Sequence, residues 1–152
     1  MAYTSESARK RLLDELAQAV DQLGTALAAL GEAYDEVDER TADVLERELF
    51  RPVQGAYGRA RRTHAEFAQR HNLPRRQFGE ASPGAHSGDP RVYVERAIDA
   101  AERADRVIAE MQDSLLPVEV GDRELRDGLT QTRELLASVP ARGRELLRTI
   151  GR

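Results

Sequence analysis

The three histidines are the side chains of this chain best suited to bind a metal ion or carry a proton. His64 and His71 are seven residues apart, which on a helix is two turns and about 10 Å, too far for both to bind one ion. The Glu-x-x-His pattern of ferritin-like di-iron sites is also missing, because no acidic residue stands three positions before His64, His71 or His86. We therefore expect no metal site. His64 is predicted to lie in a helix seam, and His71 to interact with the carbonyl groups at a helix end.

Acidic pairs and glycines form no pattern that predicts an active site. Glu36-x-x-Glu39 and Glu102-x-x-Asp105 have the spacing of the magnesium-binding pairs of all-helical nucleotide pyrophosphatases. Neighbouring apolar residues, however, place these carboxylates on the sides and outer faces of their helices. No glycine-rich segment ends in the Gly-Lys-Ser/Thr of a phosphate-binding loop, and the chain has no cysteine that could act as nucleophile or ligand. We predict no catalytic residue and no cofactor.

A basic segment follows an acidic one along the chain. Residues 51–76 carry seven arginines against Glu66 alone, whereas residues 1–50 carry twelve acidic and five basic side chains. Arginine matches the geometry of phosphates, so the basic segment could bind nucleic acid. The favoured interpretation is that it packs against the acidic residues between 35 and 48, because the whole chain has a net charge of −4. Nucleic acid is therefore not an expected partner.

Apolar spacing and composition predict an all-α fold. Only 5% of the residues are aromatic, and the apolar residues recur at steps of three and four, as on a helix that is buried along one face. We predict one domain over residues 1–152, an antiparallel up-down bundle of about four long helices. Kinks are expected at Pro52 and Pro140. The predicted helices cover residues 5–50, 53–71, 90–115 and 122–150, with an irregular connection over 72–89.

The first predicted helix is longer than the second can cover. Its apolar residues recur every seven positions through Val37 and Val44. Either Gly31 breaks it, so that a second long helix runs from about residue 32 to 71, or it is unbroken and another subunit covers the surplus. The unbroken helix is preferred because the seven-residue register crosses Gly31 without a slip. A homodimer follows, with an interface that includes Tyr34, Val37 and Val44.

The function predicted from these features is that of a non-enzymatic helical interaction protein that binds itself or another helical protein. The alternative is a small-ligand, metal or phosphate site in the bundle, lined by Tyr57, Arg61, His64 and His86. The first residues lack the basic-then-apolar pattern of a secretory signal, and no uncharged run approaches the roughly 20 residues of a membrane span. We expect a cytoplasmic protein that does not associate with membranes.

Overall fold

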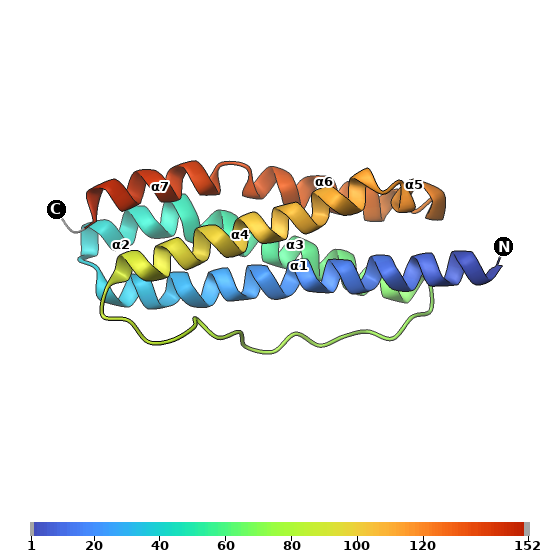
Figure 1. Cartoon of the computed structure of the whole chain (residues 1–152), viewed down its shortest axis with the longest axis horizontal. Helices are drawn as coiled ribbons and strands as arrows, with labels where there is room; N and C mark the ends of the chain where they lie inside the picture. Colours follow the sequence, from blue (N-terminus) through green and yellow to red (C-terminus); the bar gives the residue numbers. More distant parts are fainter. Residues whose placement is uncertain (1, 151–152) are drawn as a thin grey trace.

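Helices that run along one long axis make up the computed structural model of this chain (Figure 1). It describes residues 2–150, with side chains from Ser5 onward, and no strand occurs in that range. The helical elements are α1 (Ala2–Glu36), α2 (Glu39–Leu45), the π-helical turn η1 (Glu46–Phe50), α3 (Arg51–Arg70), α4 (Pro90–Asp113), α5 (Leu116–Val120), α6 (Arg123–Leu136) and α7 (Val139–Thr149). The all-α prediction is confirmed. None of the helices that the structure describes combines the length and the apolar character needed to cross a bilayer.

The first long helix is shorter than predicted. α1 stops at Glu36, and Asp38 takes an extended backbone conformation from which its carboxylate accepts a hydrogen bond from the Thr41 amide at 2.7 Å. This N-cap starts α2, and the amide donor lowers the pKa of Asp38. The prediction of an unbroken helix over 5–50 is therefore wrong, because a capping aspartate interrupts the helix within a continuous apolar register. The alternative of a break followed by a second long helix is closer, although the break lies at Asp38 and not at Gly31.

A second long arm runs from α2 through η1 to the end of α3 without leaving the helical conformation. Pro52, where the sequence predicts a boundary, lies inside this arm and directly follows the π-helical turn. Leu45, Leu49 and Val53 are buried along it. Residues assigned to the surplus of a long first helix therefore pack against the same chain. The length mismatch that motivated a dimer disappears, and self-association stays a prediction that needs other support.

The four longest stretches of helix lie side by side, and the irregular connection determines their directions. α1 packs against α3 and α4, and the α6–α7 stretch packs against the same two helices from the other side. The connection over residues 72–89 runs the length of the molecule along α1, so α3 and α4 point in the same direction (Figure 1). The up-down prediction assumed that short connections make consecutive helices antiparallel. The connection over residues 72–89 instead crosses from one end of the bundle to the other, so α3 and α4 are not antiparallel.

The last predicted helix, over 122–150, is interrupted. α6 ends at Leu136 and α7 begins at Val139, with Pro140 in the first turn of α7, where a proline needs no amide hydrogen. Pro140 therefore accompanies a boundary between two helices where a kink within one helix was predicted. Both pieces still bury their apolar residues on the same side, since Leu136 and Val139 are both in the core.

Gly128 allows α6 to approach α3 closely. A Cβ atom built on Gly128 of α6 would meet the Thr63 side chain of α3, with Cγ2 only 2.7 Å away. Thr63 cannot easily move, because its hydroxyl donates to the Arg59 carbonyl at 2.8 Å and accepts from the Arg59 guanidinium at 2.9 Å. Gly58, on the exposed side of α3, has no such neighbour within 4 Å.

We predict opposite effects for two glycine-to-alanine substitutions. Gly128→Ala should lower the free energy of unfolding by about 1–3 kcal/mol, because the new methyl group overpacks the α3–α6 contact. Gly58→Ala should raise it by about 0.5–1 kcal/mol, because it restricts the unfolded chain without a clash. Urea unfolding followed by circular dichroism measures both. Equal effects of the two substitutions would show that α3 and α6 do not approach as described.

Candidate functional site

The connection between α3 and α4 is the feature that gathers most of the predicted site residues. We call residues 72–89 the strap. It begins with a turn in which Asn72 has a positive φ of 57° and the Leu73 amide donates to the Ala68 carbonyl at 2.8 Å. It ends at Asp89, whose carboxylate accepts the Arg91 amide at 3.0 Å and so caps α4.

The first half of the strap covers the groove between α1 and α3 with side chains. The Phe78 ring is half-buried and meets His64 of α3 edge-on, with ring centroids 5.2 Å apart. The Arg76 guanidinium lies 5.0 Å from the Phe78 ring centroid and pairs with Asp21 of α1 at 2.9 Å. Ala81 lies against Gly24 of α1, since a Cβ atom on this glycine would be 3.4 Å from that of Ala81. Contacts to both helices therefore hold this half of the strap.

The second half of the strap is held by hydrogen bonds from α4. One guanidinium nitrogen of Arg96 donates to the carbonyl oxygens of Pro83 and Ala85, at 3.0 and 2.7 Å. The Ser87 amide donates to the Tyr93 hydroxyl at 2.8 Å. Arg96 also lies over the Tyr93 ring, 5.3 Å from its centroid. The two halves are thus attached by different kinds of interaction.

Three of the four predicted ligand-site residues share one face of α3. The Arg61 guanidinium lies 5.3 Å from the centroid of the Tyr57 ring, and Tyr57 lines a cleft of about 310 Å³ under the strap. His64 is only 2% exposed, and the Phe78 ring lies against it. His86 is exposed on the second half of the strap and is not brought to the other three. His64 is therefore a seam histidine, as predicted, closed off from solvent by an aromatic ring.

The pKa of His64 is lowered by its surroundings. Burial contributes most, since it disfavours the charged imidazolium. The neighbouring cations Arg76 and Arg75 act in the same direction, and the carboxylate of Asp14 on α1 opposes them. A neutral imidazole under a hydrophobic ring is poorly placed to bind phosphate, so the arrangement gives the predicted phosphate site no support.

A charged cluster at the start of α6 is the most connected polar group that the sequence did not predict. The buried Asp122 carboxylate accepts hydrogen bonds from Arg70, at 3.0 Å from Nε and 2.7 Å from Nη2, and from the Leu125 amide at 2.9 Å. The Nε2 atom of His71 lies 2.7 Å from the same carboxylate. His71 does end α3 as predicted, but its side chain contacts Asp122 and not the helix carbonyls. The sequence indicated Asp122 only as a helix start, because its partners lie about 50 residues away.

The cluster joins the end of α3 to the beginning of α6. Burial raises the pKa of Asp122, but hydrogen bonds from Arg70, the Leu125 amide and His71 outweigh burial and leave the pKa below its ordinary value. Among the described residues, no hydroxyl group hydrogen-bonds to His71, and no group of three acidic or histidine side chains is arranged to hold a metal ion. The cluster is therefore an ion-paired joint between helices.

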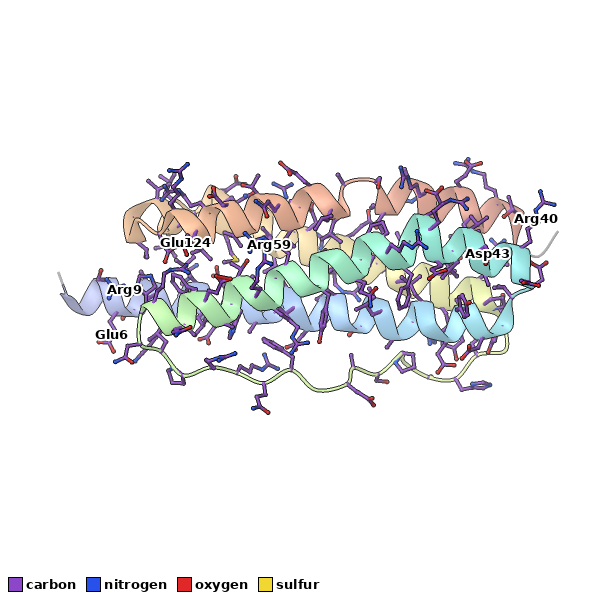
Figure 2. All side chains as sticks on the ribbon, turned by 180° about the vertical axis from the view of Figure 1, so that it is seen from behind. Glu6, Arg9, Arg40, Asp43, Arg59 and Glu124 are labelled. Carbon is purple, nitrogen blue, oxygen red and sulfur yellow. The ribbon has the colours of Figure 1, made fainter. Side chains whose placement is uncertain are left out.

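The prediction that the arginines of the basic segment pair with the acidic residues between 35 and 48 is wrong for the residues that the structure describes. Arg59 reaches from α3 toward α6 (Figure 2) and donates to Gln131 at 2.7 Å, while Arg70 also pairs with Glu124 of α6 at 2.7 Å. Arg76 pairs with Asp21 in the middle of α1. The reason is the break at Asp38, which places most of the acidic stretch on the same arm as the arginines.

We predict that Asp122→Ala lowers the free energy of unfolding by about 2–4 kcal/mol, because it removes an N-cap and leaves Arg70 and His71 without their common partner. Glu124→Ala removes only an exposed partner of Arg70 and should cost less than about 1 kcal/mol. The contribution of Asp122 to the free energy of unfolding should be complete at pH values above 3.8, the ordinary pKa of its carboxyl group. It should be lost as the pH falls through the lower pKa that Asp122 has in the folded state. Unfolding curves at several pH values measure this, and similar losses for both variants would contradict the role given to Asp122.

Comparison of the chain with known proteins supplies no relative from which a function could be transferred. No family model matches it, and no curated protein or solved structure matches it either. The strap, the charged cluster and the exposed surface of the described residues are therefore the basis on which a function is inferred.

Proposed function

We propose that this chain is a non-enzymatic interaction protein that self-associates through an apolar corner between α4 and α6. The corner consists of Leu115, Leu116, Val118 and Val120, which surround the buried Pro117. Leu115 and Val118 are each 60% exposed, and Leu116 and Val120 are half-buried. Two strongly exposed aliphatic side chains beside two half-buried ones form an apolar surface that another surface can cover favourably.

The backbone at Leu115 supports a functional interpretation. Leu115 has a φ of 67°, in the left-handed region, which costs an L-residue with a bulky side chain about 1–2 kcal/mol. Glycine or asparagine would adopt this conformation more readily, and neither would expose an isobutyl group. Unfavourable backbone and unfavourable exposure thus coincide in Leu115, and this coincidence supports a contact role for the residue.

The corner is held in a defined orientation. α5 contacts α1, α4 and α6, and Pro117 anchors it in the core. The next residues, Gly121 in a left-handed conformation and the ion-paired Asp122, fix the start of α6. A rigid apolar surface loses little conformational entropy when it binds, which favours its use as an interface.

A second copy of the chain is the partner that the charges around the corner favour. Asp113 and Glu119 lie on its α4 and α5 side, and Arg123 and Arg126 lie at the start of α6. A surface that carries both negative and positive charges can pair with a second copy of itself across a two-fold axis. A partner surface with charges of one sign only would be repelled by the like charges of the corner. The proposal is thus a homodimer.

This corner replaces the interface predicted at Tyr34, Val37 and Val44. Those residues lie at the α2 end of the molecule, opposite to α5 (Figure 1), and only Tyr34 is exposed. The alternative function, a ligand site near Arg61 and His64, is less well supported because Phe78 covers His64.

Sedimentation equilibrium tests the proposal. We predict a dimer at about 50 µM protein, and a dissociation constant at least about tenfold higher for the double variant Leu115→Asn/Val118→Asp. Asparagine tolerates the left-handed backbone, so the folded monomer should retain its stability. Leu135→Asp places a charge at another exposed leucine, on α6, and is the matched control that should leave the dimer unchanged.

Leu115→Gly separates association from folding. It should raise the stability of the monomer by about 1 kcal/mol, because glycine relieves the left-handed conformation, and it should weaken the dimer. An unmodified chain that sediments as a monomer at this concentration, or an unchanged dimer in the double variant, would exclude the α5 corner as the interface.

A further inference from the structure

Residues 74–82 of the strap are attached to the helices by side chains and not by their backbone. Within residues 2–150, no backbone amide or carbonyl group of residues 74–82 is hydrogen-bonded to a helix, whereas Arg96 and Tyr93 bind the backbone of the second half. The half-buried Phe78 ring, the exposed Arg76–Asp21 ion pair and the Ala81 contact are what hold residues 74–82. A segment with so few buried contacts opens at low cost compared with the helices.

We propose that residues 74–82 form a proton-sensitive cover over the groove between α1 and α3, which opens when His64 takes up a proton. Phe78 is the part of the cover that lies on His64. When the strap is closed, this ring removes the imidazole from water, and opening returns it to water. Because an imidazolium ion prefers water, protonation and opening favour each other.

The cations carried by the strap disfavour a charged His64. Arg75 and Arg76 come with the strap, so closure brings two cations toward the imidazole, and Asp14 on α1 is the opposing anion. On α3 itself, Arg61 lies over Tyr57, one turn before His64. The closed strap therefore favours neutral His64.

The direction of the pH dependence follows from the lowered pKa of the covered histidine. Above the ordinary value of 6.5, His64 is neutral whether the strap is open or closed, and pH has no effect. Below 6.5 the open form gains a proton that the closed form does not, so the open-to-closed ratio rises up to about tenfold per pH unit. The rise ends once the pH reaches the lowered pKa of the closed form. Acidification thus exposes the surface of α1 and α3 that faces the strap, including Gly24 and Tyr57.

A reporter for the cover is available because the chain contains no tryptophan. In a Phe78→Trp variant, the dynamic quenching of the single indole by acrylamide, measured from fluorescence lifetimes, reports its exposure. We expect the quenching constant to rise at least about threefold between about pH 7.5 and about pH 5. Circular dichroism over the same range should show no loss of helix.

Matched histidine substitutions in the Phe78→Trp background identify the group that titrates. His64→Gln should remove the pH dependence, and His86→Gln, at an exposed position on the other half of the strap, should preserve it. Arg75→Gln gives an independent readout, because without this cation the closed form takes up a proton more readily, and the rise in quenching at acidic pH should be smaller. The proposal is overturned by a quenching constant that does not change with pH, by a pH dependence that persists in His64→Gln, or by loss of helix together with the exposure.

Discussion

The hydrogen bond from the Thr41 amide to the Asp38 carboxylate marks the turn on which the rest of the packing depends. By capping α2, it lets the chain reverse immediately after α1, so that the second arm returns along the first and buries Leu45, Leu49 and Val53 against it. The reversal leaves the end of α3 at the far end of the molecule from the start of α4. The strap spans the bundle to connect these two ends (Figure 1).

Local signals in the sequence predicted the helical elements well where a cap or a proline coincided with a change in the apolar pattern. Asp89 and Pro90 start α4, and Asp122 starts α6, because a side-chain acceptor and a preset backbone angle act within one turn. The break at Asp38 escaped prediction because an apolar register shows which residues are buried, not which helix buries them. Val44 keeps the register of α1 although it belongs to the next arm.

The candidate sites were predictable to different degrees for the same reason. The burial of His64 followed from its place in the apolar spacing of α3, whereas its cover by Phe78 depends on the path of the strap, which no periodicity describes. The joint between Arg70, His71 and Asp122 links residues about 50 positions apart and required the three-dimensional arrangement. This joint also lies between the α5 corner and the strap. Asp122 comes just after α5, and His71 stands where the strap leaves α3.

The strap also affects the order in which the chain folds. Each side of the strap is a helical hairpin, α1 with α3 and α6–α7 with α4, whose contacts form between segments close in sequence and therefore form early. The broad contact between α1 and α4 is different, because it joins residues such as Gln22 and Arg103, 81 positions apart. We expect the two hairpins to dock after each has formed, through this contact and through the contact between α3 and α6. Until they dock, the small alanine side chains that line both helices are open to water, and the strap is an unconstrained tether between two half-proteins.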